Sequence, residues 1–257
     1  MVGNMLLLRQ SRSVMRRAAF LCLIGSFALV AWTGRAEFVL SLFSAATLAE
    51  DSDLRLRQSG GTDLVFHDVS FSTKDWESPI YYGGRLTYFL PKQPHWGFGL
   101  EFFHAKIYLN TEDTVRVTGT RSGQRVNDSE RVGDTIESFN ISHGLNFLTA
   151  DAMYRWILGE RGKNFLGRFQ PYVGGGIGVA IPHVESMLGG IRFEEYQLHG
   201  PAYQAFCGLN FDLTKHFSLF TEYKFTYVDL DRLNIPSGSI GLAPMNHHFV
   251  TGLSFRF

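Results

Sequence analysis

Hydrophobic and polar residues alternate along the last twelve residues of the chain. The segment 246–257 reads NHHFVTGLSFRF, and one face of it carries Phe249, Leu253, Phe255 and Phe257. A period of two indicates a β-strand with one apolar face. After the first 36 residues the sequence contains no amphipathic helix that could cover this face. The pattern therefore favours a strand that faces lipid, and the edge strand of a soluble sandwich is the alternative.

Seven earlier segments alternate in a similar way, so the chain is expected to be all-β. We predict eight strands over residues 37–44, 80–90, 96–108, 144–158, 171–181, 194–213, 217–230 and 246–257. In a bilayer every backbone polar group must be paired, so strands can cross it only as a closed barrel. The expected fold is therefore an eight-stranded antiparallel transmembrane β-barrel.

The connections between these strands differ in length and polarity. The long polar connections, which we interpret as loops, are 49–78, 110–142 and 231–245. The shorter connections include 91–94, 159–170 and 214–216. Bacterial outer-membrane barrels have long extracellular loops and short periplasmic turns, so both ends of the barrel segment are expected in the periplasm.

The first 36 residues have the features of a secretory signal peptide. Four arginines between Arg9 and Arg17 precede an apolar run over 18–32, and Gly34 and Ala36 place small residues at a cleavage site. The run is shorter than the roughly 20 residues of a spanning helix, although an uncleaved anchor is the alternative. We therefore divide the chain into a signal peptide, 1–36, and a barrel domain, 37–257. The expected location is the outer membrane of a Gram-negative bacterium.

The amino-acid composition argues against certain partners and certain kinds of site. The 24 Lys and Arg residues balance the 24 Asp and Glu residues, and no basic stripe is present, which argues against nucleic acid as a partner. The 23 Phe and 27 Gly residues suit a small barrel with aromatic girdles. Cys207 is the only cysteine after the leader, so neither a disulfide framework nor a cysteine-based metal site is expected.

Charged residues of both signs occupy inward positions of the expected strands. They are Arg85, Glu101, Asp151, Arg155, Glu222, Lys224 and Arg256. A barrel of eight strands has an interior that side chains just fill. Buried charges are tolerated only when each finds partners. We therefore expect a plug of paired charges in the lumen and not a diffusion pore.

Polar residues also extend the apolar outward face of several strands. His104 and Lys106 do so on the strand 96–108, and His183 and Glu185 follow the strand 171–181. Other polar residues expected at this level are His143, Asn146, Gln197 and His199. A charge that faces lipid is costly except near the interface, so this belt should lie at the depth of the outer-leaflet headgroups.

The four residues His104, Lys106, His183 and Glu185 are our candidate catalytic set. They offer acid–base groups, or nitrogen and oxygen ligands for a divalent metal, beside a lipid headgroup. A substrate too large for the lumen would then react outside the barrel. An interfacial girdle that contacts lipopolysaccharide phosphates is the alternative reading of the same residues.

Several phrases of the sequence resemble a known family. They are TDLVFHDVSF, PIYYGGRLTY, GFGLEFFHAKIY, HGLNFLTADAMYRW, PYVGGGIGVAIPHVE, GPAYQAF and SLFTEYKFTY. Together they cover nearly the whole mature chain and are similar to the rhizobial outer-membrane lipid A oxidases. The resemblance implies oxidation of the proximal glucosamine of lipid A to 2-aminogluconate, with molecular oxygen as co-substrate.

Two functions of different class follow from these observations. One is a lipid A oxidase of the outer leaflet, and the other is a noncatalytic barrel of the OmpA type with a structural or adhesive role; fold alone does not choose between them. The expected partners are lipid A or lipopolysaccharide and the outer-membrane barrel assembly machinery. By resemblance to other outer-membrane proteins, the terminal Phe257 is the residue that this machinery reads. We expect a monomer, and the cofactor stays open, with a divalent metal as one candidate.

Overall fold

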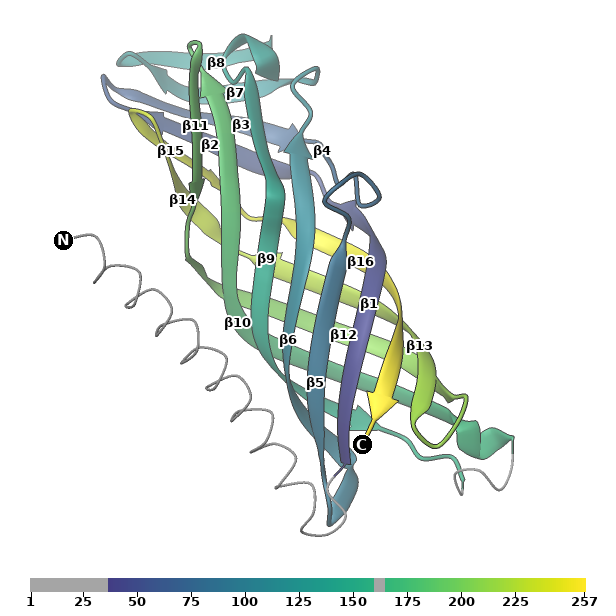
Figure 1. Cartoon of the computed structure of the whole chain (residues 1–257). Helices are drawn as coiled ribbons and strands as arrows, with labels where there is room; N and C mark the ends of the chain where they lie inside the picture. The colour runs from purple at the N-terminus through teal and green to yellow at the C-terminus, as the bar shows by residue number, and fades with distance from the viewer. Residues whose placement is uncertain (1–36, 160–164) are drawn as a thin grey trace, which may run out of the picture.

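The barrel wall consists of eight antiparallel strands that form a closed ring. The structure is a computed structural model that describes residues 37–159 and 165–257, so the expected signal peptide, 1–36, lies outside the described residues. The wall strands are β1 (Glu37–Ala49), β5 (Tyr82–Leu90), β6 (Gln93–Leu109), β9 (Ser138–Arg155), β10 (Phe169–Leu188), β12 (His199–Asp212), β13 (Phe217–Val228) and β16 (Met245–Arg256). Each pairs with the next, and β16 returns to β1 (Figure 1). The predicted eight-stranded barrel is confirmed.

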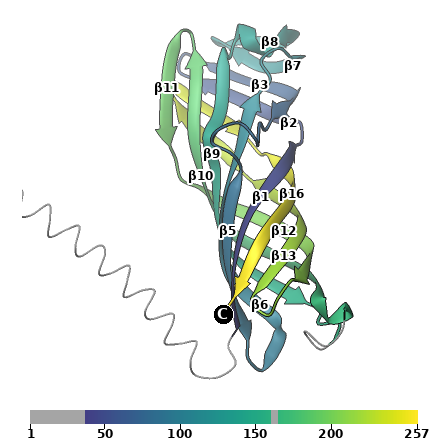
Figure 2. The same cartoon turned by 45° about the vertical axis from the view of Figure 1, so that its right-hand side comes forward.

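The pairing of β1 with β16 closes the ring. The register runs from Val39 opposite Arg256 to Ala49 opposite Asn246, and the two strands lie side by side in Figure 2. At the end of this seam the backbones of Phe38 and Phe257 exchange two hydrogen bonds, at N–O distances of 3.2 and 3.1 Å. The last residue of the chain is therefore part of the barrel closure.

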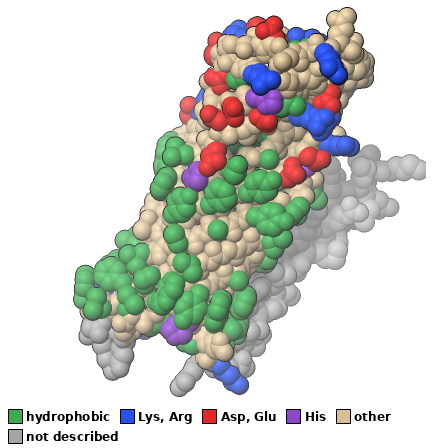
Figure 3. Space-filling view, turned by 180° about the vertical axis from the view of Figure 1, so that it is seen from behind, with side chains coloured by type: hydrophobic (Ala, Val, Ile, Leu, Met, Phe, Trp, Pro, Cys, Tyr) green, Lys and Arg blue, Asp and Glu red, His purple; other side chains and the backbone are tan. Residues whose placement is uncertain are grey.

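The outer wall of the barrel is an apolar band. Side chains that point outward from five of its strands include Leu42, Leu100, Ile177, Leu219 and Leu253, which are between 44 and 62% exposed. Figure 3 shows hydrophobic side chains along the wall, with acidic and basic side chains gathered toward one end. Exposed apolar surface of this extent on a closed ring of strands fits lipid on all sides, so the barrel spans a membrane.

Among the described residues, no helix is both long and apolar enough to cross a membrane.

The prediction that residues 49–78, 110–142 and 231–245 are loops is wrong, because most of these residues form a second sheet. Its strands, in spatial order, are β14 (Leu230–Ile235), β15 (Gly238–Leu242), β2 (Ser52–Gln58), β3 (Thr62–Val69), β7 (Thr114–Arg121) and β8 (Gln124–Arg131). We call this six-stranded unit the cap sheet. It lies at the end of the barrel opposite the C-terminus (Figures 1 and 2).

The cap sheet forms because its strands hide apolar residues between charged ones. Leu54 and Leu56 on β2 are fully buried, while Arg55 between them is exposed. Phe66 on β3 is also fully buried, and it belongs to the same continuous core as Phe103 in the barrel lumen. The many charges of these segments suggest loops, although the apolar residues have the period of a strand. The core of the protein thus extends from the lumen into the cap sheet.

The strand predicted over 194–213 is interrupted. Its first residues belong to β11 (Ile191–Tyr196), which folds back on the end of β10 through Gly189 and Gly190, at φ of 57° and 74°. Two positive φ angles are what a two-residue type I′ hairpin turn requires. The strand β12 begins only at His199. Before it, the Gln197 backbone N–H donates to the Pro182 carbonyl of β10, and the Gln197 side-chain amide exchanges two hydrogen bonds with the backbone of Asn234.

Three short elements complete the described chain. The strand β4 (Phe71–Ser72) pairs with the end of β6, and the 3₁₀ turns are η1 (Val132–Asp134) and η2 (Leu166–Arg168). Both β9 and β10 are longer than the sequence predicts, and most of their extra residues, 138–143 and 182–188, lie at the cap-sheet end. These extensions carry part of the candidate site described below.

The predicted plug of charges in the lumen is confirmed. Arg85 donates two hydrogen bonds to Glu222, at 2.8 and 2.9 Å, and a third to Glu101. Lys224 is fully buried and also donates to Glu101, while Asp151 lies 3.7 Å from the Arg85 guanidinium. Each buried charge in this network therefore has a partner of opposite sign.

A second group of charges fills the lumen near the chain termini. Arg155 and Arg256 both donate to Glu37, at 2.6 to 2.7 Å, and Arg256 also reaches Asp212 at 3.1 Å. The lumen retains a cavity of about 50 Å³ near these side chains. Pockets for drug-sized ligands are roughly 300–1,000 Å³. A lipid headgroup is therefore too large for this cavity.

The orientation of the barrel gives a direct prediction. Ser122 lies in the turn between β7 and β8 of the cap sheet, and Lys92 lies in the short β5–β6 turn; both are exposed. Because long connections are extracellular and short turns periplasmic, S122C should react with a membrane-impermeant maleimide on intact cells. K92C should react only after the outer membrane is opened. Both are made in a C207A background, and labelling of K92C alone on intact cells would reverse the orientation.

Candidate functional site

Two of the predicted site residues lie on the outward face of β6. His104 and Lys106 alternate with Phe103 and Ala105, which are buried in the lumen core. His104 and Lys106 are only 3% and 1% exposed, because neighbouring strands and the segment before β5 cover them. They are thus placed outside the barrel lumen but are shielded at this surface.

The His104 imidazole is held between two neighbouring strands. Its ring stacks on Tyr82 of β5 at a centroid distance of 5.0 Å, and its Nδ1 lies 2.9 Å from Asn146 Oδ1 on β9. Asn146 in turn donates to the carbonyl of Ile181 on β10 at 3.1 Å. The other ring nitrogen, Nε2, is buried without a hydrogen-bond partner. Within the described chain no protein group therefore satisfies the hydrogen-bonding capacity of this nitrogen.

Gly144 makes the contact between His104 and Asn146 possible. A Cβ at this position would lie 2.5 Å from His104 Nδ1 and equally close to the Asn146 amide, and φ of Gly144 is +121°. Only glycine combines this backbone conformation with so close an approach. The residue therefore positions the imidazole through the absence of a side chain.

Lys106 reaches away from His104, toward the segment that precedes β5. Its Nζ donates to the carbonyl of Glu77 at 2.8 Å and lies 5.9 Å from the centre of the Tyr108 ring. Lys74 approaches the same ring at 4.8 Å. Two ammonium groups therefore flank one aromatic ring on the outward side of β6.

A local insertion in β9 brings a further histidine to this surface. Between the pairs Ala105–Leu145 and Ile107–Ile141, β9 advances four residues where β6 advances two. This bulge contains His143, which is half exposed, and it ends at Gly144. Bulges redirect side chains at the rims of barrels. Here the bulge turns His143 toward the end of β10.

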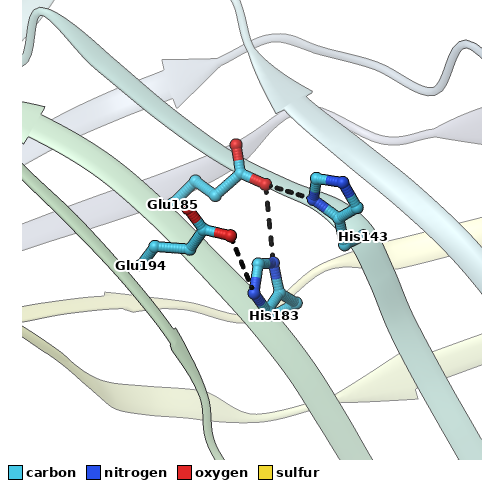
Figure 4. A group of neighbouring side chains, drawn as sticks. All are labelled: His143, His183, Glu185 and Glu194. Carbon is cyan, nitrogen blue, oxygen red and sulfur yellow. Dashed lines mark hydrogen bonds and ion pairs between the residues drawn. The ribbon is translucent and has the colours of Figure 1, made fainter.

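His143 meets three residues of the β10–β11 hairpin, as Figure 4 shows. His143 Nδ1 lies 2.6 Å from Glu185 Oε1, and His183 Nδ1 lies 3.4 Å from the same oxygen. His183 Nε2 lies 3.4 Å from Glu194 Oε1. One ligand atom from each of the four residues lies within 4.8 Å of the others. We call His143, His183, Glu185 and Glu194 the rim cluster.

The rim cluster is supported by its neighbours. The His183 ring packs on Tyr196 of β11 at a centroid distance of 4.2 Å, and its side chain is only 8% exposed. Ser142 donates a hydrogen bond to Glu185. The positions of the His183 and Glu185 side chains are therefore set by three strands together.

The structure thus places the four predicted residues in two neighbouring groups. His183 and Glu185 belong to the rim cluster, whereas His104 and Lys106 lie on β6, with the bulge of β9 between the two strands. In the described parts of the chain, no hydrogen bond or ion pair links His104 or Lys106 directly to His183 or Glu185. The connection runs through Asn146, which contacts both His104 and β10.

The candidate set omits two residues of the rim cluster. His143 is expected at this level but is not part of the predicted set, and Glu194 is assigned to the wrong strand. A signal for Glu194 is present in the sequence, because a hairpin turn at Gly189 and Gly190 places Glu194 opposite Glu185. The bulge that turns His143 has no comparable signal.

The whole chain was compared with known protein families, sequences and structures. No protein-family model matches the chain, and no curated protein sequence matches it either. Among solved structures it is similar to Neisserial surface protein A (12% identity, TM-score 0.42, covering 86% of this chain and 99% of that one). It is also similar to OprG from Pseudomonas aeruginosa (13% identity, TM-score 0.44, covering 87% of this chain and 96% of that one). A further similar structure is the E. coli outer membrane protein W (14% identity, TM-score 0.31, covering 88% of this chain and 100% of that one).

The closed ring of eight antiparallel strands and its apolar exterior give this chain the fold of an outer-membrane β-barrel.

Proposed function

We propose that the protein is an oxidase of the outer leaflet that converts the proximal glucosamine of lipid A to 2-aminogluconate. The observation that supports this proposal is the position of His104, His183 and Glu185. These acid–base groups lie on the outer side of the wall, above an apolar band that fits the acyl chains of a lipid. A substrate anchored in the membrane would present its sugar headgroup at this height.

The proposed reaction uses molecular oxygen as the oxidant. The C1–H bond of the sugar lactol breaks, and two electrons and two protons pass to oxygen, which becomes hydrogen peroxide. The resulting lactone takes up water, its ring C–O bond breaks, and the free carboxyl group of 2-aminogluconate forms. The modified lipid therefore retains one additional oxygen atom.

The side chains of the site have separate roles in this proposal. His104 would accept the proton of the C1 hydroxyl group, since a neutral imidazole is the usual general base near neutral pH. The Nε2 atom of His104, buried without a partner, supports this assignment. Lys106 would hold an anionic group of the lipid, although it now donates to the Glu77 carbonyl.

Mass spectrometry of lipid A tests the proposed function. Cells that express the gene should contain lipid A whose mass is increased by one oxygen atom, and cells without the gene should not. The oxygen dependence is checked by repeating the expression without oxygen, where the increase should disappear. Identical spectra from the two strains would contradict the proposal.

The second candidate function is a noncatalytic barrel with a structural or adhesive role. The cap sheet favours it, because a folded unit at the end of the barrel, with exposed charged side chains, offers a surface for contact with other molecules. In that case the rim residues would be a girdle that contacts lipopolysaccharide phosphates, and the lipid A spectra would not depend on the gene.

A further inference from the structure

We infer that the rim cluster is a binding site for one divalent first-row transition metal ion. The proposed ligands are His143 Nδ1, His183 Nδ1 and a carboxylate oxygen of Glu185, with Glu194 as the partner of the other His183 nitrogen. This inference goes beyond the proposed oxidation, because a bound metal is measured on the purified barrel without any lipid substrate.

The size of the rim cluster fits one ion. Zinc–nitrogen and zinc–oxygen bonds are about 2.0–2.2 Å long, so two ligands on opposite sides of one ion lie roughly 4.0–4.4 Å apart. The candidate ligand atoms lie within 4.8 Å of one another. His143 Nδ1 and Glu185 Oε1, at 2.6 Å, need to separate slightly to admit an ion between them.

The two nitrogens of His183 have different surroundings. Nδ1 is buried without a hydrogen-bond partner and lies 3.4 Å from Glu185, on the same side as His143. Nε2 lies 3.4 Å from Glu194. A histidine that binds a metal through one nitrogen usually donates its other N–H to a carboxylate, which fixes the ring and the tautomer. The arrangement around His183 corresponds to this pattern.

The charges of the rim cluster also favour a cation. Glu185 and Glu194 lie near two imidazoles. Within the described chain, the arginine that forms an ion pair with this group is Arg192, which lies 3.5 Å from Glu194 and is mostly exposed. A divalent ion would balance the two carboxylates. Figure 4 shows that one Glu185 oxygen faces both His143 and His183, while Glu194 contacts the other nitrogen of His183; His143 and Glu194 are the exposed members of the rim cluster.

The ligand types narrow the choice of metal. Imidazole nitrogen suits Zn²⁺, Fe²⁺, Co²⁺, Ni²⁺ and Cu²⁺, whereas Mg²⁺ and Ca²⁺ prefer sites built of oxygen. Two histidines and one carboxylate leave positions open for further ligands, as in the non-haem Fe²⁺ oxygenases. The proposed site is thus of a kind that also supports chemistry with oxygen, but its metal binding does not depend on that role.

Cobalt is the probe for the test, because Co²⁺ enters nitrogen and oxygen sites and gives visible absorption. Full-length mature barrel purified from outer membranes is stripped with EDTA, dialysed and titrated with Co²⁺, and bound metal is counted by inductively coupled plasma mass spectrometry. The wild-type barrel should take up a single ion per chain, with an absorption spectrum typical of imidazole ligands.

Three variants separate the proposed roles. H183A and E185Q each remove a ligand, so they should lose binding of the single ion. E194Q removes only the partner of His183, so its affinity should fall by roughly 10- to 100-fold without loss of the site. H216A, at the opposite end of the barrel in the β12–β13 turn, is the matched control and should bind as the wild type does. Heat-modifiable migration on gels establishes that each variant is folded.

The proposal is overturned if the folded wild-type barrel takes up no cobalt. It is also overturned if H183A and E185Q bind with wild-type affinity, or if H216A loses as much as they do. The outcome is distinct from that of the proposed function. Metal binding with unchanged lipid A would contradict the proposed oxidase and support the metal site. Lipid oxidation by a barrel that binds no metal would support the oxidase and contradict the metal site.

Discussion

Replacement of the buried Lys224 by methionine is expected to lower the free energy of unfolding of the barrel by about 3–5 kcal/mol. Lys224 is fully buried, donates to Glu101 and lies 3.7 Å from Glu222. Its ammonium also lies over the rings of Phe43 and Phe103, at 4.7 and 4.4 Å. Without it, Arg85 alone would balance the buried carboxylates. The measurement is equilibrium unfolding by urea in lipid vesicles, followed by tryptophan fluorescence.

Two further variants show whether the loss comes from charge. K92M makes the same replacement in an exposed turn and should change the stability by less than about 0.5 kcal/mol. The double variant E101Q/K224M leaves Arg85 paired with Glu222, so it should recover part of the stability lost in K224M. Equal stability of K224M and the wild type would show that the ion pairs do not hold the lumen together.

Replacement of His104 by alanine is expected to slow the proposed lipid oxidation by about 10²- to 10⁴-fold, the usual contribution of a general base. The imidazole faces outward and does not support the lumen packing, so the barrel should fold normally. Metal uptake should also stay unchanged, because His104 is not one of the proposed ligands. The measurement is the rate of the mass increase in lipid A, together with heat-modifiable migration and the cobalt titration.

H216A is again the matched control, since His216 lies at the opposite end of the barrel, where its ring packs near Phe255. The role assigned to His104 is contradicted if H104A modifies lipid A at the wild-type rate. It is equally contradicted if H216A is as slow as H104A. Loss of folded barrel in H104A would instead assign the residue to the structure of the wall, where its ring stacks on Tyr82.

The barrel wall can be predicted from the sequence because each strand meets two different environments. Lipid outside and a packed lumen inside force a strict alternation, as with Leu253 and Ser254 on β16, which are 55% and 4% exposed. The same alternation places Arg85 and Glu222 inside the barrel, where the structure pairs them. A side chain on the wrong face would be costly, so few alternatives remain.

The cap sheet cannot be recognised in the same way, because one of its faces is in water. Its strands are rich in charged residues, which is typical of loops. Only buried apolar residues such as Leu56 and Phe66 show the alternation of a strand. Its order also depends on long-range pairing, since β2 lies between β3 and β15, two elements from distant parts of the sequence. Local patterns do not contain this information.

The site could be predicted only in part, because two of its residues depend on how the strands pair. The outward phase of β10 continues past the apolar residues, so His183 and Glu185 follow from alternation alone. Their neighbours His143 and Glu194 depend on a bulge and on a hairpin, each of which changes the relation between sequence position and height on the wall. The complete rim cluster therefore becomes visible only when the strands are paired.

The closing seam of the barrel has a consequence for how the chain folds. The hydrogen bond between Ser41 and Ser254 joins residues that are 213 positions apart, and β1 is the first described element whereas β16 is the last. The entropy of closing so long a loop must be overcome before the first strand gains its second partner. Until β16 has been synthesised and exported, β1 has an open edge that could pair with other chains. The β1 edge is therefore the place where misassembly with another chain is most damaging, because only β16 can close the barrel there.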